Sequence, residues 1–240
     1  MHFHKSAPIF ENRYDAGRQL AEKLTEYRKQ SVIVLAIPNG GVPVALPVAL
    51  ALETDLDLVI SRKVPLPLSP EGGFGAVADD GTTILNEEMV KQAGLNQQQI
   101  NYQVSRVRAD IRQRELLHHW DKPLAILNGK TVIIVDDGMA SGYTMKAAVE
   151  SVRYRQPKEI IVAVPVAPAV AVAELEKDAD KVLTCVVGAT PRFYLSDFYR
   201  YWHEPDDEEV VQCLKEFKIR RFQSNNEPLE KVDKGNSPAL

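Results

Sequence analysis

The stretch TVIIVDDGMASGYTMKAA, residues 131–148, decides how the rest of this sequence is interpreted. Its first five residues form a β-branched, largely apolar run that leads directly into Asp136 and Asp137. Such an unbroken run is typical of a strand buried on both faces, as in parallel sheets. A loop of small residues then separates the two acids from a helical pattern. The stretch therefore predicts a strand, a ligand-binding loop and a helix.

More runs of the same kind recur along the chain: VIVLAI (32–37), LDLVIS (56–61), EIIVAVPVA (159–167) and KVLTCVVG (181–188). Helical patterns lie around and between them, and in the first pattern Ala16, Leu20, Leu24 and Tyr27 fall on one face. Strands that alternate with helices predict an α/β fold, here a three-layer domain around a parallel sheet. Right-handed crossovers place the carboxyl ends of its strands at one edge.

Two segments interrupt this alternation. Residues 64–85 are rich in Pro and Gly, and we expect a mobile loop in the first half and a short hairpin turning at Asp80-Gly81 in the second. The polar residues 86–120 predict a helical insertion. The predicted organisation is one domain over 1–222, with that insertion, a C-terminal hood and helix over 189–222, and a flexible tail over 223–240.

The composition fits a globular protein of the cytoplasm. The apolar share is 45%, the net charge is −4, and Lys and Arg are scattered, which disfavours a nucleic-acid surface. No apolar run approaches the roughly 18 residues of a membrane span. The N-terminus MHFHKSAPIF lacks the apolar core of a secretory signal. Cys185 and Cys213 lie far apart without CxxC spacing, as expected in a reducing compartment. We expect neither membrane nor nucleic acid among the partners.

The loop after the aspartates has the features of a phosphate site. Its two glycines let the backbone approach a ligand closely, and the next helix begins with unpaired N–H groups that carry partial positive charge. Thr144 and Ser141 add hydroxyl donors. Carboxylates repel a phosphate, so Asp136 and Asp137 are better explained as acceptors for two neighbouring hydroxyls. A ribose 5-phosphate carries both groups.

Two common phosphate-binding motifs do not match this string. A Walker loop requires GxxxxGK[ST] and a dinucleotide fingerprint requires GxGxxG, and the string contains neither. DDG alone is often a turn with solvated acids, and Ser-Gly often only caps a helix. The complete ordered string is seldom explained in that way.

The string resembles the ribose-phosphate signature of type I phosphoribosyltransferases, in which aliphatic residues, two acids and a small-residue loop lead to Gly-x-Thr. Gly138 departs from that signature, because those proteins more often have an aliphatic residue there. Further segments are similar to a bacterial group of predicted phosphoribosyltransferases: FENRYDAGRQLAEKL, LAIPNGGVPVA, DLVISRKVPLP, GAVADDG and DFYRYWHEPDDEEV.

The resemblance implies an enzyme that moves the 5-phosphoribosyl group from phosphoribosyl diphosphate to a nucleobase or similar heterocycle and releases pyrophosphate. It also implies a homodimer and a Mg²⁺ cofactor held mainly by the substrate, without direct protein ligands. Lys63, Asp136 and Asp137 are the implied catalytic residues, and residues 64–75 the implied flexible loop. Ala140 stands where hypoxanthine-type enzymes carry a carboxylate, which disfavours a hypoxanthine-like base.

The resemblance also assigns residues to the parts of the sugar diphosphate. Asp136 and Asp137 are assigned to the ribose hydroxyls. The 5-phosphate is assigned to Gly138, Met139, Ala140, Ser141, Gly142, Tyr143 and Thr144. The pyrophosphate is assigned to Asn39, Gly40, Gly41, Arg62 and Lys63, although relatives often have arginine at the position of Asn39. The simpler interpretations are a plain helix-start turn at 39–41 and two surface bases at 62–63.

Two other functions stay open. A protein of the same fold could sense phosphoribosyl diphosphate without catalysis, which Asn39 and the missing carboxylate at Ala140 favour. A diphosphate-synthesising kinase shares the ribose-phosphate loop, but no nucleotide site is evident. The aromatic stretch RFYLSDFYRYW (192–202) is more simply explained by packing than by stacking on a base, and His118-His119 by a helix end than by metal binding.

Overall fold

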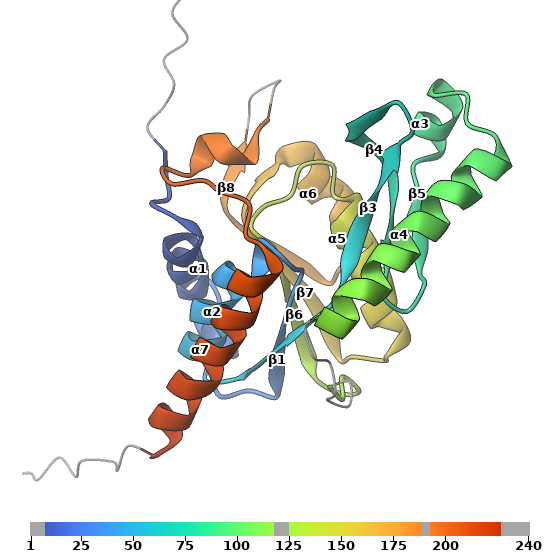
Figure 1. Ribbon diagram of the computed structural model, residues 1–240. Coiled ribbons are helices and arrows are strands. Elements are labelled where there is room, and N and C mark those ends of the chain that lie inside the picture. Colours follow the sequence, from blue (N-terminus) through green and yellow to red (C-terminus); the bar gives the residue numbers. More distant parts are fainter. Residues whose placement is uncertain (1–7, 118–124, 189–192, 227–240) are drawn as a thin grey trace, which may run out of the picture.

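A computed structural model of the chain describes residues 8–117, 125–188 and 193–226 (Figure 1). Its centre is a five-stranded parallel sheet in the order β2-β1-β6-β7-β8. The strands are β1 (Val32–Ala36), β2 (Asp55–Leu58), β6 (Thr131–Val135), β7 (Glu159–Pro168) and β8 (Lys181–Gly188). Helices flank both faces, which confirms the predicted three-layer α/β fold.

The three central strands of this sheet, β1, β6 and β7, are buried on both faces. In β1, Val34 and Ala36 pack into one core, whereas Ile33 and Leu35 pack into the other. Alternate residues of a strand point to opposite faces, so burial on both sides requires an unbroken apolar run. The first core lies under α1 (Arg13–Glu22), α2 (Gly41–Leu52) and α7 (Asp207–Asn226), and the second under α5 (Tyr143–Tyr154) and α6 (Ala169–Leu175).

A second, antiparallel sheet stands beside the parallel one (Figure 1). It consists of β3 (Ser61–Leu66), β4 (Ser69–Ala78) and β5 (Thr83–Leu85), and is followed by α3 (Glu87–Gln92) and α4 (Gln97–Leu117). Phe74 of the sheet and Val104 and Ile111 of α4 share one core. The segment predicted as a helical insertion is thus packed against a sheet in its described part.

This antiparallel sheet corrects two predictions. The run LDLVIS is not one strand, because the chain leaves the parallel sheet after Leu58 and begins β3 at Ser61. Residues 64–75, predicted as a loop, lie mostly in the paired strands β3 and β4. Gly75 fits this tight pairing, since a Cβ there would lie 2.3 Å from the carbonyl oxygen of Ile84. The predicted turn at Asp80-Gly81 does join β4 to β5.

Two helices have bounds that the sequence pattern does not give. Proline is usually destabilising inside a helix, yet α2 begins at Gly41 and contains Pro47. Its ring packs against α1 at Gly17, where a Cβ would come within 2.5 Å of Pro47 Cγ. Helix α7 continues to Asn226, past the domain boundary predicted at 222, and the remainder of the predicted tail lies outside the described residues. In the described ranges, no helix combines the length and apolarity needed to cross a membrane.

Candidate functional site

The chain changes direction across the parallel sheet between β1 and β6. From β1 it passes through α2 to β2 on one side, whereas from β6 it passes through α5 to β7 on the other. Ligands of open α/β sheets bind at such a switch point, at the carboxyl ends of the strands. The two predicted ligand segments, residues 39–41 and 136–144, follow these two adjacent strands.

The two loops are in direct contact. A Cβ on Gly40 would lie 2.2 Å from Oδ2 of Asp137, and a Cβ on Gly41 would lie 2.7 Å from the carbonyl oxygen of Val135. The peptide bond between Pro38 and Asn39 is cis. Glycine at both positions therefore lets the turn predicted for pyrophosphate lie against the acid pair predicted for ribose.

The loop after the acids leads into α5 through Gly142, whose φ of 82° favours glycine. No side chain in the described part of the chain caps this helix end. The first-turn N–H groups of α5 therefore suit an anion, as the sequence predicts. Ser61 Oγ donates to the carbonyl oxygen of Thr144 at 2.8 Å, which ties the start of β3 to this loop.

Gly138, the departure from the family signature, is explained by the C-terminal segment. A Cβ there would lie 2.2 Å from Cδ2 of Leu195, which belongs to the short helix η2 (Leu195–Phe198). The N–H of the buried Met139 donates to the carbonyl oxygen of Val166 at 2.9 Å. The loop is thus held by packing from the hood and β7, although Gly138 has no side chain.

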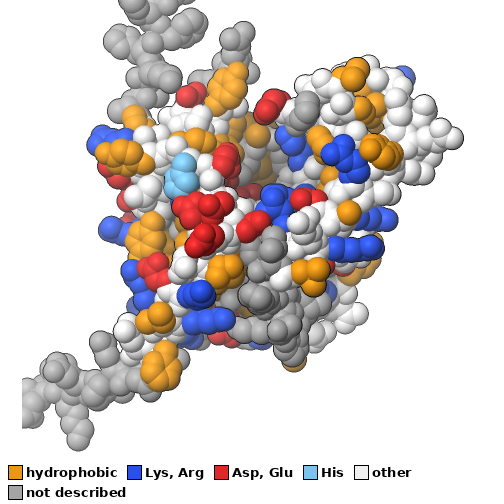
Figure 2. Space-filling model, viewed as in Figure 1, with side chains coloured by type: hydrophobic (Ala, Val, Ile, Leu, Met, Phe, Trp, Pro, Cys, Tyr) orange, Lys and Arg blue, Asp and Glu red, His pale blue; other side chains and the backbone are white. Residues whose placement is uncertain are grey.

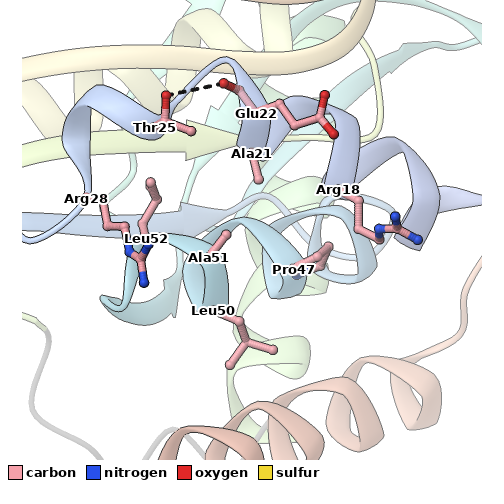
Figure 3. Close-up of a pocket in the computed structure, with 9 residues that line it drawn as sticks. All are labelled: Arg18, Ala21, Glu22, Thr25, Arg28, Pro47, Leu50, Ala51 and Leu52. Atoms are coloured by element: carbon pink, nitrogen blue, oxygen red, sulfur yellow. Dashed lines mark hydrogen bonds between the residues drawn. The ribbon is translucent and has the colours of Figure 1, made fainter. Parts of the chain in front are cut away.

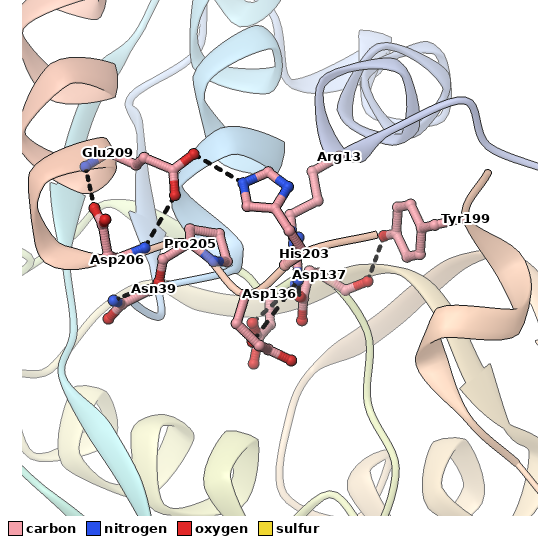
Figure 4. Close-up of polar contacts among 10 residues, drawn as sticks. Arg13, Asn39, Asp136, Asp137, Tyr199, His203, Pro205, Asp206 and Glu209 are labelled. Atoms are coloured by element: carbon pink, nitrogen blue, oxygen red, sulfur yellow. Dashed lines mark hydrogen bonds and ion pairs between the residues drawn. The ribbon is translucent and has the colours of Figure 1, made fainter. Parts of the chain in front are cut away.

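The two aspartates have different surroundings (Figure 4). Asp137 is buried: Nε of Arg13 donates to its Oδ2 at 2.8 Å, and the hydroxyl of Tyr199 donates to its carbonyl oxygen at 2.5 Å. Asp136 lines a pocket, and its Oδ1 accepts from the N–H of Asp137 at 2.8 Å. Burial and then the charge of Asp137 raise the pKa of Asp136 well above its usual range. Asp136 thus lines the pocket, whereas Asp137 contacts Arg13 and Tyr199 of the protein.

Arg13 is a site residue that sequence reasoning missed. Its buried guanidinium carbon lies 4.0 Å from the centre of the Trp202 ring, and Nη1 donates to the carbonyl oxygen of His203. It joins α1 and the C-terminal segment to the acid pair (Figure 4). A signal was present, because Arg13 lies three residues before Ala16 on the apolar face of its helix. A basic residue there needs a buried partner.

A pocket of about 570 Å³ opens beside Asp136. Its lining includes four residues predicted for the site, namely Arg62, Lys63, Asp136 and Thr144. Helix α4 forms another part of the wall, with Gln103, Arg106, Val107 and Asp110. Figure 2 shows acidic and basic side chains gathered around the hollow between the α7 and α4 sides of the molecule.

Other predicted residues lie next to this pocket without lining it. Asn39, Gly40, Gly41 and Asp137 belong to the adjacent loops. In the phosphate loop, Ala140 and Ser141 are exposed. A separate hollow of about 70 Å³ is lined by Ser141, Gly142, Tyr143 and Lys146, among others. The fold thus brings the predicted groups to one edge of the sheet, and Thr144 connects the phosphate loop to the larger pocket.

A chain of charged groups lies at the α4 side of the site. Arg62 Nε and Arg114 Nε lie 3.5 and 3.3 Å from the same Oδ2 of Asp110. Arg114 Nη1 also lies 2.6 Å from Oδ1 of Asp207 and 3.2 Å from Oδ1 of Asn39. Burial and then the charge of Arg114 lower the pKa of Arg62. The Asn39 side chain is therefore engaged within the protein.

The site offers few direct ligands for a metal ion. Among the described residues, no three His, Cys, Asp or Glu side chains form a group that could hold one. The pocket does contain oxygen donors of the type that Mg²⁺ prefers, on Asp136, Asp110 and Gln103. These residues fit a Mg²⁺ ion that takes most of its ligands from a bound phosphate compound. His118 and His119 lie outside the described residues.

The aromatic residues of the hood pack together. Ring centroids lie 5.2 Å apart in Phe193–Phe198, and 5.3 Å apart in both Phe10–Tyr199 and Tyr199–Trp202. Tyr194 and Tyr201 are exposed.

A second large hollow, of about 440 Å³, lies between α1, η1 (Thr25–Tyr27) and α2 (Figure 3). Its lining includes Arg18, Glu22, Pro47 and Leu50. The structure describes all of the predicted site residues, and none of them lines this second hollow.

Known proteins resemble this chain over most of its length. A family model for the phosphoribosyl transferase domain matches residues 9–197. Two proteins of Mycobacterium tuberculosis, from strains CDC 1551 and H37Rv, are provisionally named phosphoribosyl transferases. Each is 35% identical over 206 residues, which is 86% of this chain and 46% of the relative. The chain thus spans about half the length of these curated relatives. The crystal structure of TT1426 from Thermus thermophilus matches with a TM-score of 0.71 at 35% identity, over 87% of this chain and 98% of that one.

Proposed function

The chain belongs to the phosphoribosyltransferase family, and from this premise we propose that it transfers a 5-phosphoribosyl group from phosphoribosyl diphosphate to a nucleobase or similar heterocycle. Pyrophosphate is the second product. One observation carries this proposal: Asp136 and Thr144 of the ribose-phosphate signature line the same pocket as Arg62 and Lys63. Phosphoribosyl diphosphate carries hydroxyls, a phosphate and a diphosphate. Its binding site therefore requires an acid, a phosphate loop and cations in one place.

The start of α5 supports the assignment of the 5-phosphate. The backbone N–H groups of residues 140–144 would bind its oxygens, because the first turn of α5 has no side-chain cap in the described structure, whereas the N–H of Met139 already donates to Val166. The contact between Ser61 and the carbonyl oxygen of Thr144 holds this loop beside β3. The phosphate would therefore anchor the sugar at a fixed distance from the basic residues of β3.

Asp136 is proposed to accept hydrogen bonds from the ribose hydroxyls. Positive charge builds on the ribose ring as the bond from C1 to pyrophosphate breaks, and a nearby carboxylate stabilises that charge. The burial that raises the pKa of Asp136 also strengthens its interaction with a developing cation. For Asp137 the contacts with Arg13 and Asp136 support a positioning role in addition to the predicted binding role.

Lys63 and Arg62 are proposed to bind the departing pyrophosphate, with the N–H groups of residues 39–41 nearby. Mg²⁺, when bound with the donor, would neutralise part of the charge of the diphosphate. Asp136, which lines the pocket beside Arg62 and Lys63, would be a protein carboxylate able to share that ion. The exposed part of the hood around Tyr194 and Tyr201 is the proposed approach for the heterocycle.

We place this reaction in the cytoplasm and in a homodimer, as the sequence suggests. Cys185 and Cys213 are free thiols, which fits a reducing compartment. The homodimer is supported by the family resemblance.

A non-catalytic sensor of the sugar diphosphate is the second candidate. The observation that favours it is the engagement of Asn39, whose Nδ2 donates to the carbonyl oxygen of Pro205 at 2.8 Å and whose Oδ1 accepts from Arg114. The side chain at this position thus gives no positive charge to a leaving group.

Calorimetric titration tests the proposal. Native protein with Mg²⁺ should bind phosphoribosyl diphosphate, and the double variant Asp136→Asn/Asp137→Asn should lose that binding while a thermal melt shows that it is folded. Native protein that binds no sugar diphosphate would refute both candidates. If it binds, pyrophosphate release with a panel of purine and pyrimidine bases identifies a transferase, and its absence with every base identifies a sensor.

A further inference from the structure

The geometry points to α4 as a wall of the site for phosphoribosyl diphosphate. On this wall, Arg106 binds the diphosphate group, and Gln103 accepts a hydrogen bond from the bound sugar diphosphate or from water around it. This inference rests on the proposed function. It adds two binding residues from a helix that sequence reasoning placed in an insertion, and to which it gave no role in donor binding.

One face of α4 supplies all of its pocket residues. Gln103, Arg106, Val107 and Asp110 are spaced at i, i+3, i+4 and i+7, so they lie along one stripe of the helix. Val107 also packs into the core that α4 shares with the antiparallel sheet. The wall is thus fixed to the same sheet that carries Arg62 and Lys63.

The cations of the pocket differ in their partners. Arg62 shares Asp110 with Arg114, so the acid on the pocket face of α4 is already paired. Lys63 Nζ donates to a neutral group, the carbonyl oxygen of Glu71, at 2.7 Å. Within the described ranges, neither Lys63 nor Arg106 has a carboxylate at ion-pair distance, and the Arg106 guanidinium carbon lies 5.9 Å from the Tyr102 ring centre. Two uncompensated positive charges at one pocket attract a multiply charged anion.

Gln103 gives independent evidence for a polar ligand. Its side chain lines the pocket but is 6% exposed, and its Oε1 has no hydrogen-bond partner among the described residues. Buried polar atoms are normally paired, because an unmade hydrogen bond costs stability. A hydroxyl of bound phosphoribosyl diphosphate, or a water on the Mg²⁺ ion bound with it, would donate the missing hydrogen bond to Gln103.

This placement also accounts for Asn39. Relatives often have an arginine at this position, whereas Asn39 is bound to Arg114 of α4 and to Asp207 of α7. The glycine turn can then offer the diphosphate only its backbone, and α4 provides the cation through Arg106 instead.

Calorimetric titration of the protein with inorganic pyrophosphate, in the presence of Mg²⁺, tests the contact between Arg106 and the diphosphate. The variant is Arg106→Gln, and the matched control is Arg112→Gln. Arg112 is exposed on the same helix but lines a different hollow near Asp80. Arg106→Gln should weaken binding about tenfold, as for one charge-assisted contact, and Arg112→Gln should leave it unchanged. Equal losses in both variants, or none in Arg106→Gln, would overturn the inference and leave the proposed function standing. A native protein that binds neither pyrophosphate nor phosphoribosyl diphosphate would overturn both.

Gln103→Leu provides a second test, because it keeps the side-chain volume and removes the unpaired oxygen. We expect an unchanged or higher melting temperature together with weaker binding of phosphoribosyl diphosphate. A lower melting temperature with unchanged affinity would show that Gln103 is structural and would remove it from the proposed wall.

Discussion

The two sides of the pocket are built in different ways. On the side of the acid pair, buried contacts fix the loops: Arg13 pairs with Asp137, and Leu195 fills the space at Gly138. On the side proposed to bind the diphosphate, Lys63 and Arg106 are exposed cations. Packing gives the first side a fixed shape, whereas charge would give the second side its affinity for the proposed ligand.

This difference separates stability from binding. Removal of the Asp137 carboxylate should act first on folding, because it leaves the buried Arg13 without its partner. Substitutions of the exposed cations should act on ligand affinity, and salt should weaken their contribution by screening.

The largest expected effect is the loss of stability in Asp137→Ala. Removing this carboxylate leaves the Arg13 guanidinium buried without its acid, which costs about 3–5 kcal/mol for a buried pair that loses one partner. Urea unfolding measures the change in the free energy of unfolding. Lys63→Ala is the control from the other side of the pocket and should leave that free energy unchanged. A loss below about 1 kcal/mol in Asp137→Ala, the range of a surface pair, would mean that Arg13 does not depend on Asp137.

The second effect is a loss of function in Lys63→Ala without a loss of stability. We expect about tenfold slower pyrophosphate release, because one charge-assisted contact with the leaving group is lost. Release is measured at low and high salt. The difference from native protein should shrink as salt increases, because Lys63 is exposed and its charge is screened. An unchanged rate at low salt would make Lys63 an ordinary surface base.

The parallel sheet could be predicted because burial on both faces leaves a local signature. The strands β1, β6 and β7 coincide with continuous apolar or β-branched runs, and the acid pair follows β6 directly, whereas the edge strand β2 contains Asp55 and Asp57 and only overlaps such a run. The β3–β4 hairpin could not be predicted in the same way, since its Pro- and Gly-rich composition is typical of loops. In the fold, glycine is needed there for close approach: a Cβ on Gly73 would lie 2.5 Å from Cγ of Lys63.

Prediction from sequence has the same limit at the candidate site, because it finds residues that are close along the chain and misses those that only the fold brings together. The phosphate loop is contiguous, so its residues could be assigned together from one string. Arg13 and Asp137 are 124 positions apart, and only the fold shows that they form a pair. Helix α4 reaches the pocket because it packs on β3 and β4, whose pairing the sequence did not predict.

The smallest expected effect is at Asp136, where the packed side of the pocket meets the ligand. Burial and the charge of Asp137 raise its pKa above the ordinary value of 3.8, so the native state binds this proton more tightly than the unfolded chain does. The associated stability is complete at pH values below the unfolded pKa and is lost as pH rises through the folded pKa. Asp136→Asn has no such loss. In thermal melts from about pH 4 to neutral, the melting temperature of Asp136→Asn minus that of native protein should therefore increase as pH rises. A difference that is constant with pH would contradict the raised pKa. A growing difference would mean that the buried contacts around Asp137 impose a stability cost on Asp136, and that the protein keeps this acid for the ligand rather than for the fold.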